Sequence, residues 1–364
     1  MTQPVGTVNP MQLHLVGGFL GSGKTTAIAG AAKELVWRGQ SVGVITNDQG
    51  RLLVDTSFLR FLGVPTVAVV GGCFCCNYNE LVAKLDELRS KVKPAVVFAE
   101  SVGSCTDMVA TVLKPLQEFQ AGQVTVASFS VFVDIRLLRL RLLGQPLPFT
   151  DDIQYIFEKQ LEEASLIVLN HGDEVPPGIA PETEALARRF YPGTTLRWQN
   201  SLDRASVTGW LDLISSGQVP LATKSLALDY HRYGAGEADL AWLDERIALT
   251  FPAGQGRAVV TRLLEEIVGT MRRENIPVAH LKCAIESAPS PAKISVTAFD
   301  TIAWRNAVPE LAGTEATLIL NARVQAGADR LRALVHAAVQ TVHGAESQAT
   351  AFHPGQPKPT HRFD

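Results

Sequence analysis

Short apolar segments alternate with helical patterns through the first two thirds of the chain. The segments are rich in Val, Ile and Leu without polar alternation, as expected for strands buried on both faces of a parallel sheet. They cover residues 13–16, 42–46, 66–70, 95–99, 124–133 and 166–169, and the helical patterns between them include residues 25–38, 80–92 and 153–164. This alternation predicts a doubly wound α/β domain with a mostly parallel sheet.

The pattern changes after a stretch of different composition at residues 217–240. Strand-like segments then occur at 246–251, 280–286, 294–305 and 316–325, with helical patterns at 257–275 and 329–343. This order predicts a smaller α+β domain with a mostly antiparallel sheet. We therefore expect an α/β domain over residues 1–217, a linker with a connecting helix at 218–245, the second domain at 246–345 and an extended proline-rich tail at 346–364.

The composition is that of an ordinary globular protein. The chain has 364 residues, of which 46% are hydrophobic and 19% charged, and its net charge is −3. This charge gives no broad basic field for nucleic acid or an anionic membrane. No apolar run approaches the length of about 20 residues that spans a bilayer, and the N-terminus lacks the pattern of an export signal. We expect a cytoplasmic protein whose five cysteines are not a disulfide framework.

The most specific motif runs from Gly18 to Thr25 and reads GFLGSGKT, a match to G-x-x-x-x-G-K-[ST]. It lies between a predicted strand and a predicted helix, which is the context the motif requires. Its glycines let backbone N–H groups converge on phosphate oxygens, and the helix N-terminus adds to that positive field. We expect Lys24 to reach the β- and γ-phosphates and the Thr25 hydroxyl to bind Mg²⁺. The other expected nucleotide-binding residues of this loop are Gly18, Gly21, Ser22, Gly23 and Thr26.

Further polar motifs begin where predicted strands end, and ligands bind at that edge of a parallel sheet. Glu100 follows the strand at 95–99, where an acid can hold Mg²⁺ or its waters, so it joins Lys24 as a candidate catalytic residue. Asn170 and Asp173 follow the strand at 166–169. A buried Asp173 could pair with the two donors of guanine but would be left unpaired by adenine, which favours GTP over ATP. Asp48, after the strand at 42–46, is a less specific candidate metal ligand.

Three cysteines, Cys73, Cys75 and Cys76, fall within four positions directly after the strand at 66–70. Soft thiolates suit Zn²⁺, Cu(I) or Co²⁺. C-x-C-C is too short to close a tetrahedral metal site alone. The fourth ligand must therefore come from elsewhere, or the fourth coordination position stays open, and an open position suits a metal carrier. Inert buried thiols are the alternative. Cys105 could join the cluster. We expect Cys283 to lie in the core of the second domain, and we expect His353 and His361 to be exposed to solvent.

Together these segments resemble the CobW-type branch of the P-loop GTPases, a metal-handling family that includes the hydrogenase and urease nickel-insertion GTPases. The resemblance rests on GGFLGSGKTT (17–26), GGCFCC (71–76), ESVG (100–103) and the pair Asn170 and Asp173, and more weakly on YGAGEADLAWLD (233–244) and the tail. It implies a GTPase whose hydrolysis gates the delivery of metal to a client metalloprotein or metal-cofactor enzyme. The implied ligands are GTP, Mg²⁺ and, at Cys73, Cys75 and Cys76, Zn²⁺ or Co²⁺. Homodimer formation stays open.

Two positions depart from the family pattern. His171 stands where the family's Asn-Lys-x-Asp motif has lysine, and Asp48 replaces the longer acid of the family's Asn-Glu-Phe-Gly. Two other functions also stay open. One is an ATP-dependent small-molecule kinase whose second domain holds the acceptor, and the other is a non-catalytic nucleotide switch whose cysteines only pack. Nucleotide preference and single-turnover hydrolysis distinguish the three.

Overall fold

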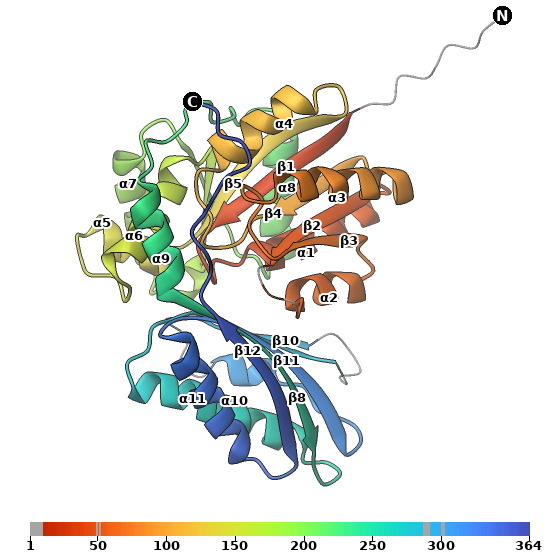
Figure 1. Ribbon diagram of the computed structural model, residues 1–364. Helices are drawn as coiled ribbons and strands as arrows, with labels where there is room; N and C mark the ends of the chain where they lie inside the picture. Colours follow the sequence, from red (N-terminus) through yellow and green to blue (C-terminus); the bar gives the residue numbers. More distant parts are fainter. Residues whose placement is uncertain (1–9, 49, 51, 287–291, 300–302) are drawn as a thin grey trace, which may run out of the picture.

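The computed structural model describes residues 10–48, 50, 52–286, 292–299 and 303–364, and it places two sheets one beside the other (Figure 1). The first sheet has seven strands, all paired in parallel, in the order β3-β2-β4-β1-β5-β6-β7. The predicted doubly wound α/β architecture is confirmed. The strands are β1 (Met11–Gly18), β2 (Val42–Asp48), β3 (Thr66–Val70), β4 (Val96–Glu100), β5 (Val124–Asp134), β6 (Leu166–Asn170) and β7 (Thr195–Trp198).

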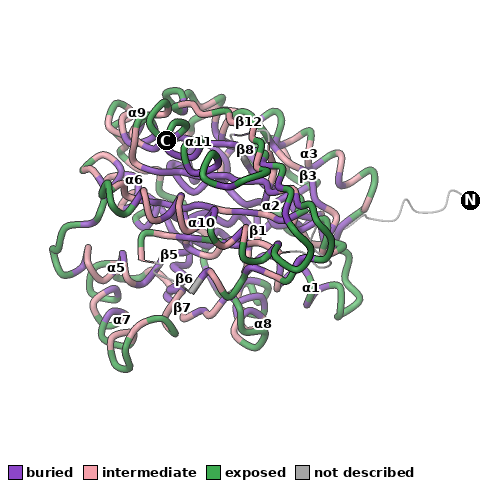
Figure 2. The backbone as a smooth tube through the Cα atoms, turned by 90° about the horizontal axis from the view of Figure 1, so that it is seen from below, coloured by how far each residue is buried: buried purple, intermediate pink, exposed green. Residues whose placement is uncertain are grey.

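Helices cover both faces of this sheet. One face packs against α1 (Lys24–Trp37), α2 (Val54–Phe61) and α8 (Arg204–Ser215). The opposite face packs against α3 (Tyr78–Lys91), α4 (Lys114–Phe119), α5 (Ile135–Leu142), α6 (Asp151–Glu162) and α7 (Ile179–Phe190). Since both faces are covered, the strands are buried, and Figure 2 shows the buried residues concentrated in the strands of the two sheets.

The second sheet is antiparallel, with the order β10-β9-β11-β8-β12. Its strands are β8 (Leu240–Thr250), β9 (Val278–Ile285), β10 (Ala292–Val296), β11 (Glu315–Gln325) and β12 (Ala345–Phe352). Helices α10 (Gly256–Arg273) and α11 (Ala328–Gln340) share a hydrophobic core with one face of this sheet. The predicted α+β character of this half is therefore confirmed.

Two expectations for the second half need correction. The strand predicted at 294–305 is wrong beyond Val296, because residues 303–307 form a 3-10 helix and 300–302 lie outside the described residues. Among the described residues β10 is an edge strand paired with β9 alone. Apolar residues beyond Val296, its last paired residue, therefore have no neighbouring strand to bond with. Residues 345–352, at the start of the expected tail, instead add β12 to the other edge of the sheet.

A single helix, α9 (Tyr230–Asp239), connects the two halves and continues directly into β8. It begins at Asp229, whose carboxylate accepts from the backbone N–H groups of His231 and Arg232. It packs closely on α6, since a Cβ at Gly236 would lie 2.4 Å from the carbonyl oxygen of Asp152. This contact holds the start of the second sheet against the α/β domain.

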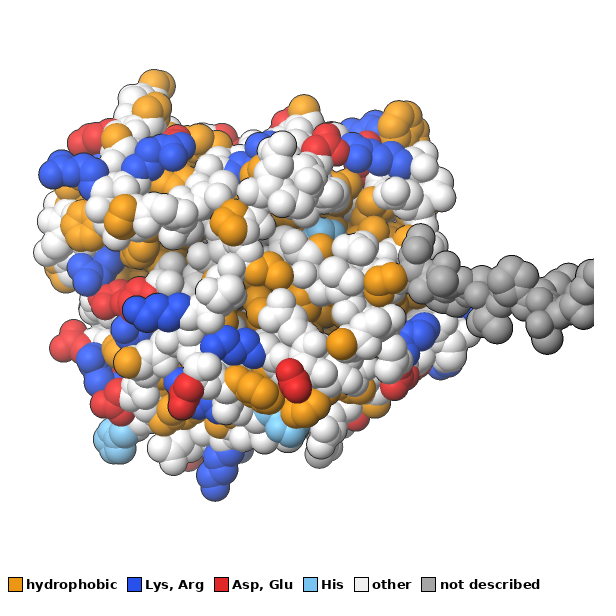
Figure 3. Space-filling view, turned by 90° about the horizontal axis from the view of Figure 1, so that it is seen from above, with side chains coloured by type: hydrophobic (Ala, Val, Ile, Leu, Met, Phe, Trp, Pro, Cys, Tyr) orange, Lys and Arg blue, Asp and Glu red, His pale blue; other side chains and the backbone are white. Residues whose placement is uncertain are grey.

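The outer surface carries no dominant charge of one sign on the face seen from above, where basic and acidic side chains are interspersed (Figure 3). Among the described residues, no helix is long and apolar enough to cross a membrane.

Candidate functional site

The phosphate-binding loop lies between the end of β1 at Gly18 and the start of α1 at Lys24. Gly18, Gly21 and Gly23 have φ values of 120°, 76° and 88°, in the region that favours glycine. At Gly23 a Cβ would lie 2.1 Å from the Asn170 amide nitrogen. These glycines are therefore required by both the backbone turn and the close packing around it.

Lys24 is held inside this loop. Its Nζ donates to the carbonyl oxygens of Gly18 at 2.7 Å and Phe19 at 3.0 Å. Burial lowers the pKa of Lys24 to about 8, although the nearby Glu100 carboxylate opposes that shift. The ammonium group is thus held against the backbone of the phosphate loop.

Thr25 and Glu100 meet beside the loop. The Thr25 hydroxyl donates to Glu100 Oε1 at 2.8 Å, whereas Glu100 Oε2 is buried and has no hydrogen-bond partner among the described residues. Burial raises the pKa of Glu100, and the Asp55 charge adds to that rise. A hydroxyl and an unsatisfied carboxylate oxygen are the hard ligands that Mg²⁺ prefers, so these residues fit a magnesium site. The side chain of Asp48, the third candidate ligand, lies outside the described part of the structure.

The opposite end of the loop is bounded by Asn170 and His171. Asn170 donates to the Ser22 carbonyl oxygen at 2.8 Å and accepts from the Ser201 N–H at 3.2 Å, which ties the loop to the segment after β7. His171 Nδ1 lies 2.8 Å from Glu174 Oε1. Burial is the largest single influence and lowers the pKa of His171, but the hydrogen bond to Glu174 and the charges of Asp134 and Glu174 together raise it above the usual value. Asp173 is exposed, so the argument from a buried unpaired carboxylate does not apply in this structure.

These residues line one cavity of about 430 Å³. It contains the loop residues from Gly21 to Thr26 together with Glu100, Asn170 and Asp173. Part of its remaining wall comes from the second sheet and the residue that follows β10, and these lining residues are Trp242, His280, Lys282, Lys293, Ser295 and Thr297. A Cβ at Gly21 would lie 2.7 Å from a methyl carbon of Thr297, so the second sheet packs directly on the phosphate loop.

The three clustered cysteines follow β3 in a tight turn. Their sulfur atoms all lie within 4.8 Å of one another, with Cys73 Sγ 2.6 Å from that of Cys75 and 3.4 Å from that of Cys76. Asn47, near the end of β2, holds the turn through its side chain, which donates to the Gly72 carbonyl at 2.6 Å and accepts from the Phe74 N–H at 2.8 Å. The three sulfurs therefore converge on one point.

Cys105 joins this cluster from the segment after β4. Its buried thiol lies close enough to those of Cys73 and Cys75 to shift their pKa values. The contacts with Cys105 and Cys75 hold the pKa of Cys73 well below that of a free thiol. Gln160 fixes the Cys105 segment by donating to the carbonyl oxygens of Gly103 at 3.0 Å and Cys105 at 2.8 Å. The sulfurs of Cys73, Cys75 and Cys76 lie within 4.8 Å of one another, and Cys105 beside them is a candidate ligand for the position that the sequence left open. Cys283 lies in the core of the second domain, as expected.

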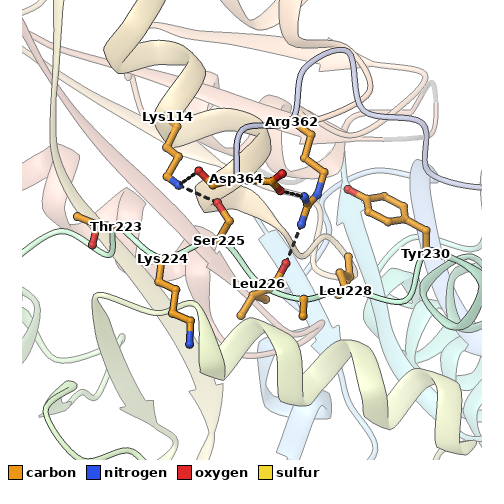
Figure 4. Close-up of a pocket in the computed structure, with 10 residues that line it drawn as sticks. Lys114, Thr223, Lys224, Ser225, Leu226, Leu228, Tyr230, Arg362 and Asp364 are labelled. Carbon is orange, nitrogen blue, oxygen red and sulfur yellow. Dashed lines mark hydrogen bonds and ion pairs between the residues drawn. The ribbon is translucent and has the colours of Figure 1, made fainter.

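The C-terminal tail lies over the cysteine turn. The Lys358 N–H donates to Cys76 Sγ at 3.2 Å, and Thr360 bonds to the carbonyl oxygens of Cys75 and Cys76 at 2.9 Å each. Farther along the tail, Lys114 donates to the backbone carbonyl of Asp364 (Figure 4). Arg362 donates to the Asp364 side chain and to the Leu226 carbonyl in the segment before α9. A cavity of about 250 Å³ separates Cys73 and Cys76 from the start of this tail.

The two tail histidines contact other parts of the protein in this structure. His353 is exposed, but its ring nitrogens bond to the Ala238 carbonyl at 2.7 Å and the Ala328 N–H at 3.0 Å. His361 packs edge-on against the Tyr78 ring, with the centroids 5.0 Å apart. Both histidines anchor the tail.

The nucleotide loop and the cysteine cluster lie at the same edge of the parallel sheet, as predicted. The strand register pairs Val16 in β1 with Glu100 in β4. In the sheet order β3 lies three strands from β1, which is a distance of about 14 Å between the two strands at the usual strand spacing. The segment after β4 spans this gap. A Cβ at Gly103 would lie 3.0 Å from Leu20 Cα in the phosphate loop, and Cys105 reaches the cysteine cluster two residues later.

Comparison with known proteins agrees with this geometry. The model of the CobW/HypB/UreG nucleotide-binding domain matches residues 12–195, just over half of the chain. The chain belongs to the CobW/HypB/UreG family. It is 35% identical to the Escherichia coli zinc chaperone YjiA over 103 residues, which are 28% of this chain and 32% of that protein. It is 26% identical to the Pseudomonas aeruginosa zinc chaperone CobW over 215 residues, or 51% and 53% of the two chains. The chain thus spans a third to a half of the length of these relatives.

Solved structures with a similar outline include zinc-bound YjiA from E. coli, with a TM-score of 0.39 and 14% identity over 90% of this chain and 99% of that one. Another is Helicobacter pylori HypB in complex with nickel, with a TM-score of 0.42 and 14% identity over 60% and 91% of the two chains.

Several residues of this CobW-type site were given no role in the sequence analysis. Asn47 and Gln160 position the cysteine turn and the Cys105 segment, and Lys282 and Lys293 reach the nucleotide cavity from the second domain. Asn47 was visible as a polar residue at a strand end. The two lysines look like ordinary polar positions of alternating strands, so only the packing of the two sheets reveals them.

Proposed function

We propose that this chain is a GTP-hydrolysing metal chaperone that holds a soft cation, Zn²⁺ in the first instance, and transfers it to a client metalloprotein. The observation that carries the proposal is the segment from Glu100 to Cys105, which contacts both the phosphate loop and the cysteine cluster. The curated relatives described above are named zinc chaperones, which supports Zn²⁺ as the cargo. Five free thiols suit the reducing cytoplasm.

In the nucleotide half of this proposal, the loop N–H groups and Lys24 bind the phosphates, and Thr25 with Glu100 holds Mg²⁺. When bound, Mg²⁺ neutralises charge on the phosphate oxygens. Hydrolysis forms a bond from a water oxygen to the γ-phosphorus and breaks its bond to the β–γ bridging oxygen, so that GDP and phosphate leave. Asn170 and Asp173 remain the proposed contacts to the guanine base.

In the metal half, Cys73, Cys75 and Cys76 bind the cargo and Cys105 supplies a fourth sulfur. Four thiolates make a closed site that retains zinc, whereas three leave a position through which a client ligand can enter. Because Cys105 follows Glu100 by five residues, a shift of that segment on nucleotide binding changes whether the fourth sulfur reaches the metal. The nucleotide state thereby controls retention and release.

A titration with Zn²⁺, with and without a non-hydrolysable GTP analogue, tests the proposal. Loss of one sulfur from a four-sulfur site removes about 3 kcal/mol, which is roughly 100-fold in affinity. We expect Cys105→Ser to weaken zinc binding by that amount in one nucleotide state only, and the triple change of Cys73, Cys75 and Cys76 to Ser to abolish it in both. Equal zinc affinity in the wild type and the triple variant contradicts the metal half.

The same protein samples decide between the alternative functions. Preference for ATP with turnover that depends on a small acceptor would indicate a kinase. Nucleotide binding without single-turnover hydrolysis would indicate a non-catalytic switch.

A further inference from the structure

The second sheet turns a polar face toward the nucleotide cavity. In β9 and β10 alternate residues enter the core of the second domain, among them Leu281, Cys283, Ile294 and Val296. The residues between them point the other way and line the cavity, and these are His280, Lys282, Lys293 and Ser295. The alternation of a strand pair thus delivers two lysines to a site made by the other domain.

Both lysines bind one carboxylate of the α/β domain. Lys282 Nζ lies 2.5 Å from Asp55 Oδ2 and Lys293 Nζ lies 2.7 Å from Asp55 Oδ1. All three side chains are largely buried, with 17%, 9% and 7% of their surface exposed for Lys282, Lys293 and Asp55. Asp55 lies in the first turn of α2, so this helix is joined to the second sheet by the two ion pairs. Burial opposes ionisation of Asp55, but the lysines hold its pKa well below the usual range.

Three lysine side chains meet at this end of the cavity. Lys24 lies near Glu100, and Lys282 and Lys293 both pair with Asp55. Lys282 is near enough to Lys24 for its charge to lower the pKa of Lys24. A triphosphate carries several negative charges, and buried lysines grouped beside a phosphate-binding loop are suited to bind them.

We propose that Lys282 and Lys293 bind the terminal phosphate of the nucleotide and exchange between that phosphate and Asp55. The inference rests on the proposed function, in which the cavity takes a nucleoside triphosphate. When the lysines bind Asp55, α2 is joined to the second sheet; when the phosphate takes them, that junction opens. The second domain thereby responds to the nucleotide state and supplies positive charge to the reaction from within the same chain.

Affinity measurements with GDP and a non-hydrolysable GTP analogue test this exchange in the full-length protein. The informative variants are Lys282→Met, Lys293→Met and Asp55→Asn. Lys91→Met is a matched control, because Lys91 lies on α3 with 70% of its side chain exposed. We expect each cavity variant lacking a lysine to bind the GTP analogue about 10- to 100-fold more weakly, the range of a charge-assisted hydrogen bond, with a smaller loss for GDP. Asp55→Asn removes the competing carboxylate and should bind the GTP analogue more tightly.

The outcome with Asp55→Asn separates exchange from a purely structural ion pair, since a structural pair would leave affinity unchanged or weakened when broken. Equal losses for GDP and the GTP analogue in the lysine variants would overturn the role of the terminal phosphate. If the wild type binds nucleotide but Lys282→Met and Lys293→Met bind it as well as Lys91→Met does, this inference alone is overturned. A wild-type protein that binds neither nucleotide overturns the proposed function together with it.

Discussion

Arg323 and Glu237 form a buried ion pair whose disruption should be costly. Arg323 in β11 has no exposed side-chain surface, Glu237 in α9 has 2%, and Arg323 Nη2 lies 3.3 Å from Glu237 Oε2. Arg323 also lies over the Trp242 ring, 5.2 Å from its centroid, and 3.4 Å from the Ser104 hydroxyl. The guanidinium therefore links the second sheet, the connecting helix and the segment between Glu100 and Cys105.

Replacing Arg323 with Met leaves the Glu237 charge buried without its partner. Such a loss costs about 3–5 kcal/mol. Glu237 lines the cavity beside Cys73, so water can reach the vacated position, and we expect the lower end of that range. With a urea dependence of about 1–3 kcal/mol per molar, the unfolding midpoint of Arg323→Met should fall by about 1 M or more.

Urea unfolding followed by tryptophan fluorescence measures this shift, because Trp242 adjoins Arg323. The double variant with Glu237→Gln removes the unpaired charge and should recover much of the loss. Arg330→Met is the surface control, since Arg330 pairs with Glu274 while 55% exposed. A midpoint of Arg323→Met that matches the surface control, or no recovery in the double variant, would refute the reasoning.

Three further predictions follow from the same structure. Gly23→Ala should abolish nucleotide binding in a filter or calorimetric assay, because the added Cβ would meet the Asn170 amide at 2.1 Å with φ at 88°; retained affinity would contradict this. Burial raises the pKa of Glu163 to about 8 from 4.5, so the wild type should lose stability as the pH rises from 4.5 to 8 relative to Glu163→Gln. Urea midpoints at pH 5 and 8 measure that difference, and a constant difference would contradict it. Deleting residues 353–364 should speed alkylation of Cys76, whose sulfur the tail covers; an unchanged rate would contradict that cover.

The sequence predicted the parallel domain well because its signals are local. Buried strands such as β3 are continuous apolar runs with the predicted bounds, and the phosphate loop is a contiguous motif between a strand and a helix. Elements with weaker local patterns were missed: β7 has four residues and is only partly buried. The strand predicted at 294–305 was too long because strand length depends on a pairing partner, which lies elsewhere in the chain.

What a contiguous stretch of residues encodes could be derived without coordinates: the glycine turn around phosphate, the three adjacent thiols, and the shared edge that parallel strands impose. Contacts between distant segments could not. Cys105 beside Cys73, the tail over Cys76, and Asp55 between Lys282 and Lys293 each join residues far apart in the chain. Such contacts depend on how two sheets and a connecting helix pack in three dimensions, and no local pattern of apolar and polar residues specifies that packing.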